Sequence, residues 1–199
     1  RAEEVLAEVI RPLAETSWVV GSTDDEAGLL DCLKATVAHR LLCGHRHGPT
    51  GVSTWNRLVA KRLGARGDWY PGRPLLVTRS GIRTGLVNGD TGIVVGTPQG
   101  PRACFRIHGR PTLLSQGQLP PTETAYALTV HKSQGSEYPD VTLLLPPVGS
   151  PLLQRELLYT AVTRASGSVT VVGSEAALRT AVSERAVRMT GLADALAAP

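Results

Sequence analysis

The stretch Thr129-Val-His-Lys-Ser-Gln-Gly-Ser-Glu137 decides how the rest of this sequence is interpreted. A short apolar run, Tyr126 to Leu128, precedes it, and a second strand-like run, Val141 to Leu145, follows it. A β-strand that ends in a polar, glycine-containing turn places its last side chains at the carboxyl edge of a sheet, where ligands bind in open α/β sheets. The hydroxyls, imidazole, amide, glycine and carboxylate of this turn suit contact with a polyanion.

Length and composition indicate one domain, or one domain with a small insertion, because 199 residues with 42% hydrophobic content can bury a real core. No apolar run approaches the roughly 20 residues of a membrane span, so no membrane partner is expected. No charged-then-apolar leader opens the chain, and we expect a cytoplasmic location. The net charge of +4 favours an anionic partner only mildly, because arginine, alanine and glycine are abundant throughout the chain.

The three cysteines, Cys32, Cys43 and Cys104, are an odd number and form no CxxC pair. A complete disulfide framework is therefore excluded, and buried free thiols in a reducing cytosol are expected.

Helical and strand-like segments alternate along the chain, a pattern that predicts an α/β fold with a mostly parallel sheet. Asp24 to Glu26 supply charge for the start of the second helix, and Ser53 is a candidate N-cap for the third. The expected helices are residues 1–15, 24–37, 53–63, 152–165, 174–182 and a short final one at 185–196, and the expected strands include residues 40–43, 74–78, 126–128, 141–145 and 168–172.

Residues 91–119 differ in sequence pattern from the rest of the chain. Short β-like runs at 92–95, 103–107 and 112–114 alternate with Gly/Pro turns, which indicates a small antiparallel barrel or meander. This segment lies between one core strand, at 74–78, and the strand before Thr129, so we predict an insertion into the α/β domain.

Four segments carry a resemblance to a known family. Thr129 to Glu137 resembles motif V of superfamily 1 DNA helicases, and Glu156-Leu-Leu-Tyr-Thr-Ala-Val-Thr-Arg-Ala165 resembles their motif VI. With Leu86-Val-Asn-Gly-Asp-Thr-Gly92 and Thr190-Gly-Leu-Ala-Asp-Ala-Leu196, the chain is most similar to the RecD family. Members of that family are subunits of RecBCD-type helicase-nucleases, also called exodeoxyribonuclease V. The resemblance covers roughly residues 41–196.

The resemblance implies the second RecA-like, P-loop-NTPase-type motor domain of a helicase, at residues 41–90 and 120–199. Residues 91–119 are expected to correspond to the family's inserted Src-homology-like β-barrel. Residues 1–40 lie outside the resemblance, and their helical pattern predicts an N-terminal helical segment of the motor domain. No GxxxxGK[ST] pattern and no Gly-Lys dipeptide occur. The phosphate-cradling loop and the Mg²⁺ ligands are therefore expected in an N-terminal RecA-like domain of the same polypeptide, and this chain alone is expected to be inactive.

For the nucleotide, the family implies two arginines and two residues of motif V. Arg164 resembles the arginine finger of motif VI, and Arg46 resembles the motif IV arginine that reaches the γ-phosphate of ATP. Gly135 would bring a backbone N–H to phosphate, and Glu137 would accept from ribose hydroxyls. Without the family, Arg164 is a cation near a helix end and Arg46 is a solvated loop arginine.

For single-stranded DNA, the family implies that Thr129 and His131 face the DNA backbone and that Gln134 links the two sites. Asn88 and the inserted barrel would add further contacts with the single strand. Lys132 either contacts phosphate or is simply solvated. No metal site is predicted in this chain, because the pair His45 and His47 has no acid or cysteine at matching spacing.

The sequence therefore predicts the C-terminal motor domain of an ATP-dependent 5′-to-3′ DNA helicase subunit, in a RecBCD-type exonuclease that acts in double-strand break repair. ATP with Mg²⁺ is the expected cofactor. Two alternatives remain open. One is the helicase segment of a conjugative relaxase, and the other is a non-catalytic DNA-binding or scaffold subunit with a helicase-derived fold.

Overall fold

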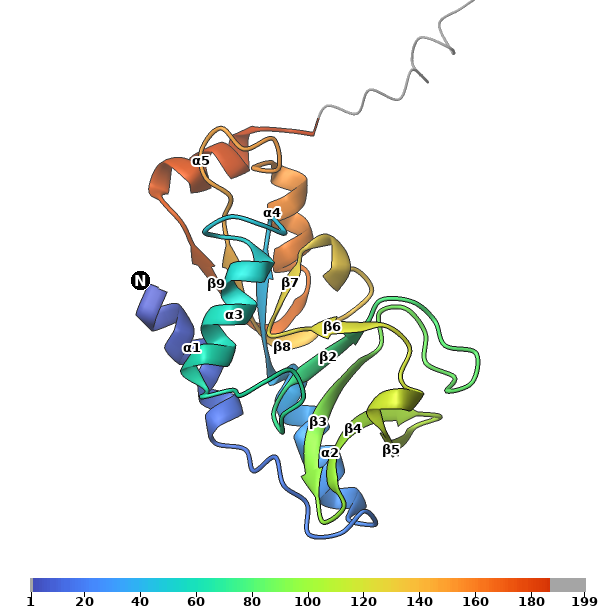
Figure 1. The fold of residues 1–199 in the computed structure, drawn as a ribbon. Helices are drawn as coiled ribbons and strands as arrows, with labels where there is room; N and C mark the ends of the chain where they lie inside the picture. Colours follow the sequence, from blue (N-terminus) through green and yellow to red (C-terminus); the bar gives the residue numbers. More distant parts are fainter. Residues whose placement is uncertain (1, 187–199) are drawn as a thin grey trace, which may run out of the picture.

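Two β-sheets, one parallel and one antiparallel, organise residues 2–186, the part of the chain that the computed structural model describes (Figure 1). Most of the predicted helix at 185–196 lies outside these residues. Among the described residues, no helix is both long enough and apolar enough to cross a lipid bilayer.

The parallel sheet has the strand order β7-β1-β8-β9, and all three of its strand pairs are parallel. Its central strands are almost completely buried, as expected for parallel strands covered on both faces. The prediction of an α/β fold with a parallel sheet is confirmed. The strands are β1 (His39–Cys43), β7 (Ala127–Thr129), β8 (Tyr138–Leu144) and β9 (Ala165–Val172).

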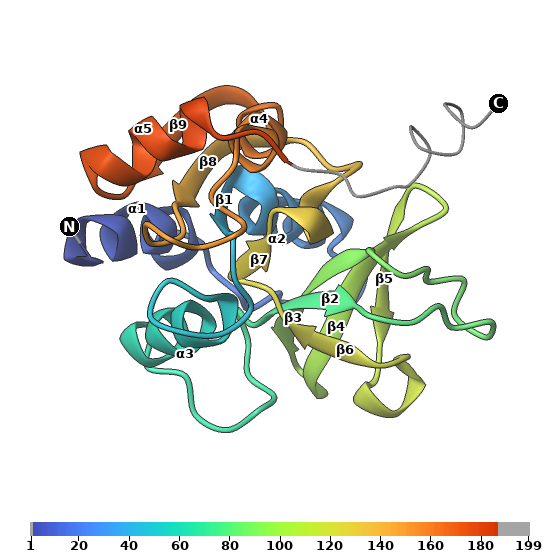
Figure 2. The ribbon, with the colours of Figure 1, turned by 90° about the horizontal axis from the view of Figure 1, so that it is seen from above.

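Helices cover both faces of this sheet. One hydrophobic cluster packs α1 and α3 on one face, and a second packs α4 and α5 on the other, with the end of α2 beside them. In Figure 2, α4 and α5 lie at the top of the view and α3 lies below the parallel strands. The first five predicted helices are confirmed, although the fourth is shorter than expected. Their bounds are α1 (Ala2–Ala14), α2 (Glu26–Ala38), α3 (Val52–Arg62), α4 (Arg155–Val162) and α5 (Glu175–Ser183).

The antiparallel sheet has the order β5-β4-β3-β2-β6. Leu29 and Leu33 of α2 pack against it beside Ile93, so α2 joins the two sheets. The strands are β2 (Pro74–Val77), β3 (Thr91–Thr97), β4 (Gly100–Ile107), β5 (Arg110–Leu114) and β6 (Thr122–Thr124).

One strand assignment was wrong. The run at 74–78 was expected in the core sheet, but β2 pairs antiparallel with β3 and with β6. Leu75 and Val77 pack against Val94 and Phe105, so their apolar surface is buried in this second sheet. A short run that is apolar at every position is buried on both faces, and such a pattern does not specify which sheet accepts it.

The predicted insertion at 91–119 contains β3, β4 and β5, and the sheet also takes in β2 and β6 on either side. In the strand pairing of residues 2–186, β5 and β6 stand at opposite edges of an open order, so a closed barrel is not confirmed. The division of the chain at 91–119 stays a prediction.

Arg40 is buried where the two sheets meet. Its guanidinium donates to the carbonyl oxygens of Ala125 and Thr36 and lies 4.9 Å from the ring centroid of Tyr138. Burial lowers the pKa of this arginine, because removal from water penalises the charged form. Arg40 thus ties β1 to the segment that enters β7 and to the start of β8.

Candidate nucleotide and nucleic-acid site

The segment that resembles motif V runs from one end of the parallel sheet to the other. Thr129 ends β7 at the level of Cys43, the last residue of β1, so it lies at the carboxyl edge. A short 3-10 turn, η2 (His131–Ser133), follows. Tyr138 then begins β8, which runs parallel to β1, so the chain has returned to the amino edge. Within this segment, the residues assigned to DNA therefore lie near the carboxyl edge, and those assigned to nucleotide lead to the amino edge.

At the carboxyl edge, one carboxylate engages two cations. Arg46 Nη2 lies 3.3 Å from Glu123 Oε2, and Lys132 Nζ pairs with the other oxygen, Oε1. Thr129 Oγ1 accepts from the backbone N–H of Lys132 at 3.2 Å. A cavity of about 310 Å³ lies between these residues and Asn56. This is a cationic recess whose charge is partly neutralised by an internal carboxylate.

Sequence reasoning missed Glu123. It lies on β6, far along the chain from Arg46, and the triplet Thr-Glu-Thr belongs to no recognisable pattern. Its only local signal is its position nine residues before Lys132. Because it comes from the antiparallel sheet, Glu123 connects the two sheets at the site.

The loop that carries Arg46 is held by the start of α3. Gly51, not Ser53, is the N-cap residue, so the predicted cap was wrong. Ser53 instead donates its hydroxyl to the carbonyl of Arg46 at 2.6 Å. A Cβ on Gly51 would lie 2.3 Å from the carbonyl oxygen of His47, so the close approach of the loop to the helix requires glycine.

At the amino edge, Arg164 contacts the end of motif V. It follows α4 and directly precedes β9, and its Nη1 donates to the carbonyl of Ser136 at 3.2 Å. Its Nε donates to Thr160 O, and its Nη2 donates to Thr163 Oγ1, both at 3.2 Å. Arg164 is half-buried, and none of the ion pairs in residues 2–186 involves it. Its positive charge is held by neutral oxygens only.

Gly135 and Glu137 flank the residue that Arg164 contacts. Gly135 has φ of +85°, a conformation that favours glycine, and nothing lies within 4 Å of the place where a Cβ would stand. Glu137 is exposed. Through its contact with Ser136, Arg164 lies close in space to Gly135 and Glu137, whereas Arg46 follows the carboxyl end of β1, at the opposite edge of the sheet.

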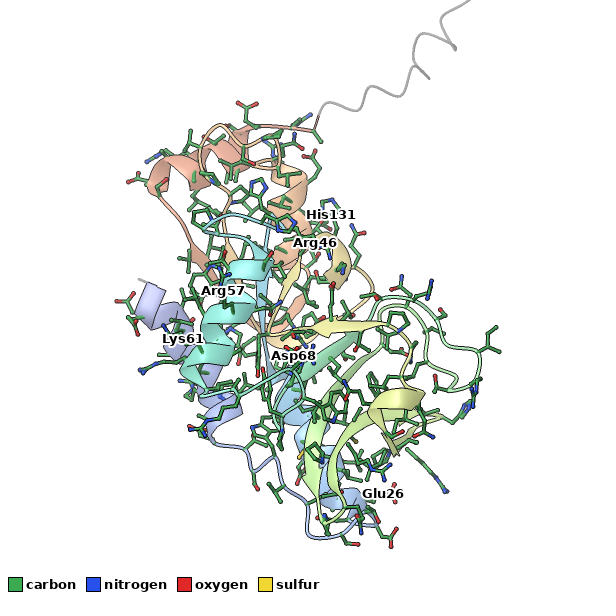
Figure 3. All side chains as sticks on the ribbon, viewed as in Figure 1. Glu26, Arg46, Arg57, Lys61, Asp68 and His131 are labelled. Carbon is green, nitrogen blue, oxygen red and sulfur yellow. The ribbon has the colours of Figure 1, made fainter. Side chains whose placement is uncertain are left out.

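The remaining predicted DNA-binding residues are divided between two places. His131, Lys132 and Gln134 are exposed on η2 or next to it. Figure 3 shows His131 and Arg46 in the same upper part of the molecule. Asn88 is exposed on the link between β2 and β3, where its backbone N–H donates to Ser80 Oγ at 3.0 Å. That link projects away from η2 in both ribbon views (Figures 1 and 2).

The two histidines beside Arg46 are engaged in hydrogen bonds. His45 Nε2 lies 2.9 Å from Ser150 Oγ, and His47 Nδ1 lies 3.0 Å from Ser53 Oγ. Among residues 2–186, no group of three His, Cys, Asp or Glu side chains is placed to hold a metal ion.

Nucleophilic chemistry by the thiols is disfavoured. Cys32, Cys43 and Cys104 are free and buried. Burial raises the pKa of Cys43 and of Cys104 to about 12, so both stay protonated near neutral pH. Cys43 ends β1 immediately before the Arg46 loop, and its role there is packing.

Comparison with known proteins agrees with this geometry. Residues 124–172, which contain both helicase-like motifs, match the UvrD-like helicase C-terminal domain. The RecD subunit of the RecBCD enzyme from Mycolicibacterium smegmatis is 47% identical over 198 residues, covering 95% of this chain and 34% of that protein. The ATP-dependent RecD2 DNA helicase of Deinococcus radiodurans is 33% identical over 170 residues, covering 81% of this chain and 24% of that protein. This chain thus spans about one third of the relatives' length, or less.

A solved structure shows the same fold. The Pif1 helicase from Bacteroides, in complex with ADP-AlF3 and ssDNA, matches with a TM-score of 0.50 and 15% identity, covering 97% of this chain and 52% of that chain. The fold and the two motifs define a C-terminal domain of the superfamily 1 DNA helicases. Within that class, the chain belongs to the RecD family.

Proposed function

We propose that this chain is the C-terminal motor domain of an ATP-dependent DNA helicase that moves 5′ to 3′ on single-stranded DNA. The observation that carries the proposal is the contact between Arg164 and the carbonyl of Ser136. It joins the helix that resembles motif VI to the segment that resembles motif V, and that segment continues to the polar turn at the other edge of the sheet. Because this segment is one continuous stretch of backbone, a movement at its nucleotide end would be transmitted directly to its DNA end.

Arg164 suits an ATP γ-phosphate. Its charge faces three neutral oxygens, so an incoming phosphate oxygen gains an uncompensated guanidinium. An arginine finger is worth about 10³–10⁵ in the rate of phosphoryl transfer, because it stabilises charge in the transition state. Gly135 would offer its open backbone to phosphate, and Glu137 would accept from the ribose. Arg46 reaches nucleotide only after release from Glu123.

Bound ATP with Mg²⁺ would supply the phosphoryl group and the hydrolysis energy. We expect the Mg²⁺ ligands and the phosphate-cradling loop in the N-terminal RecA-like domain of the same polypeptide. This chain would supply Arg164, and its contacts would orient the guanidinium towards the cleft between the two domains. Residues 74–124 would add their antiparallel sheet to the DNA track.

Thr129, His131, Lys132 and Gln134 are proposed to hold single-stranded DNA at the carboxyl edge. Hydroxyl, imidazole and ammonium groups donate hydrogen bonds to phosphate oxygens. Binding through such contacts does not depend on the base sequence of the DNA. Asn88 is proposed as an additional contact from the link between β2 and β3.

The relatives favour a motor over the alternatives. We propose that the whole protein works in the cytoplasm with other subunits of a RecBCD-type exonuclease in double-strand break repair, since a RecBCD subunit is 47% identical. A conjugative relaxase would carry an N-terminal metal-binding histidine cluster in its flanking sequence. A scaffold subunit would have no use for the uncompensated Arg164.

The test is the DNA-stimulated ATPase of the full-length protein with Arg164→Ala, Arg164→Lys and wild type, with ATP binding followed in parallel. A loss of turnover by about 10³-fold or more with ATP binding kept would support the motor. The variant Arg164→Lys should restore little of the turnover, because lysine lacks the planar fork of donors. Unchanged turnover in Arg164→Ala would sink the proposal and favour the scaffold.

A further inference from the structure

A second cationic recess lies along the carboxyl-terminal half of α3. This cavity of about 620 Å³ lies between α3, the segment 64–73 and β6. Its basic lining residues are Arg57, Lys61, Arg66 and Arg73, and Asp68 is its one acidic lining residue. We call it the α3 groove. Figure 3 shows Arg57 and Lys61 on α3, with Asp68 near the lower end of the helix.

The cations of this groove are largely unused within the fold. No hydrogen bond or ion pair between residues 2–186 engages the side chains of Arg57, Lys61 or Arg66, and all three are exposed. Arg73 is fixed instead, donating from Nε to Thr124 Oγ1 at 3.1 Å and from Nη1 to the carbonyl of Asp68. Arg57 and Lys61 are four residues apart and therefore lie on one face of the helix. The groove thus has excess positive charge and room for a ligand.

The α3 groove lies next to the recess at motif V. Asn56 and Thr124 line both cavities, so the two share a wall at the middle of α3. The helix has 11 residues and is about 16 Å long. Cations therefore follow one another from Lys132 near the amino end of α3, through Arg57, to Lys61 near its carboxyl end. At about 3.4 Å for each stacked nucleotide, this length accommodates roughly five nucleotides.

We propose that the α3 groove binds backbone phosphates of the single strand that passes motif V, with Arg57 and Lys61 as the principal contacts. The inference rests on the proposed function, because it extends the same DNA track. A line of unpaired cations suits a polyanion with regular charge spacing. Protein-binding sites rely on buried aromatic and apolar anchors. Here the one aromatic in the lining is Tyr70, whose hydroxyl already pairs with Tyr126 at 3.1 Å.

The experiment measures binding of fluorescent oligothymidylate to the full-length protein by anisotropy, across a range of salt concentrations. In Arg57→Gln with Lys61→Gln, the negative slope of log K against log [salt] should become shallower by about 1.4, because each phosphate contact on a single strand contributes about −0.7. At 0.1 M salt this corresponds to about 25-fold weaker binding. Asp68→Asn removes the one opposing charge and should strengthen binding.

Two controls separate charge at the groove from charge in general. Arg57→Lys with Lys61→Arg keeps both charges and should keep the wild-type slope. Arg62→Gln removes a charge from the same helix, but Arg62 lines a different cavity beside Trp18, so DNA binding should not change. The substituted side chains of Arg57, Lys61, Arg62 and Asp68 are all exposed. The partly buried Arg73 is left unchanged, so the variants are expected to fold.

A comparison with Lys132→Gln at motif V distinguishes this inference from the proposed function. If Lys132→Gln weakens binding and the groove variant does not, the groove is not part of the track, while the proposed function stands. If the wild-type protein fails to bind oligothymidylate, both fail. If the groove variant keeps DNA binding but loses binding of a polyglutamate peptide, the groove accepts an acidic protein segment and the inference is wrong.

Discussion

Asn56 of α3 pairs with the backbone of Ala127 on β7. Its Oδ1 accepts from the Ala127 N–H at 2.7 Å, and its Nδ2 donates to Thr124 O at 2.9 Å. β7 is an edge strand of the parallel sheet, so its outer N–H has no neighbouring strand to bond. The side chain of Asn56 supplies the missing partner. It also stands between the motif V recess and the α3 groove, and so holds both in place.

Replacing Asn56 by alanine should therefore destabilise the domain. The change leaves the backbone N–H of the buried Ala127 without a partner, which costs about 1–3 kcal/mol in the free energy of unfolding. Urea unfolding followed by circular dichroism measures this difference. The matched control is Asn88→Ala, which removes an exposed amide and should change stability by less than about 0.5 kcal/mol. Equal effects of the two variants would contradict the role assigned to Asn56.

Glu123→Gln should tighten the binding of single-stranded DNA at low salt. The change frees both Arg46 and Lys132 from their shared carboxylate. Exposed ion pairs are worth about 0.2–1 kcal/mol each, which corresponds to a few-fold gain in affinity. Anisotropy titrations at low and high salt measure the gain, which should shrink as salt screens the charges.

The control for this variant is Glu175→Gln. Glu175 pairs with Arg179 at 2.6 Å on α5. This ion pair involves neither Arg46 nor Lys132, the cations of the motif V recess. Its loss should leave DNA binding unchanged. Weaker binding in Glu123→Gln would instead show that Glu123 orients the two cations productively.

The stability of the domain should decrease below about pH 6.5 because of His39. Burial lowers the pKa of His39 from its ordinary value of 6.5, against the opposing effect of Glu8 and Asp140 and together with Arg11. Its ring contacts Glu8 O at 3.0 Å and Thr142 Oγ1 at 2.8 Å. The unfolded chain therefore binds a proton at a higher pH than the folded chain does, so stability present above pH 6.5 is lost as the pH falls.

The measurement is the free energy of unfolding of wild type and His39→Gln from pH 8 to pH 5. The variant is expected to be less stable at pH 8, because glutamine does not reproduce both ring contacts, and to depend less on pH. Parallel pH profiles for the two proteins would show that another group controls the acid response.

The polypeptide of residues 1–199 should not hydrolyse ATP on its own. Positive charge from Arg164 assists phosphoryl transfer only when Mg²⁺ and a phosphate-cradling loop hold the nucleotide. The assay is phosphate release with and without single-stranded DNA, after circular dichroism has established that the polypeptide is folded. Robust DNA-stimulated turnover would contradict the assignment of the catalytic parts to another domain.

Local patterns were sufficient for most elements and for the family. The apolar periodicity of α1 and the acidic start of α2 predicted both helices, because amphipathic spacing and N-terminal charge act within a few residues. Arg164 and the motif V residues were found because they occur in contiguous runs with a recognisable order. Glu123 was missed, since its meaning depends on Arg46, which is 77 residues away.

By itself, the sequence determined the order of the helices and strands, the parallel character of the main sheet and the membership of the RecD family. Tertiary structure alone decided that β2 joins the antiparallel sheet and that Arg46 and Arg164 lie at opposite edges of the parallel sheet. It also decided that Asn56 stands between two cationic recesses. The physical reason is range: backbone preference and side-chain periodicity act between near neighbours in the chain. Strand partners and converging charges depend instead on contacts between segments far apart in sequence, where the gain from burial must exceed the entropy of closing the loop.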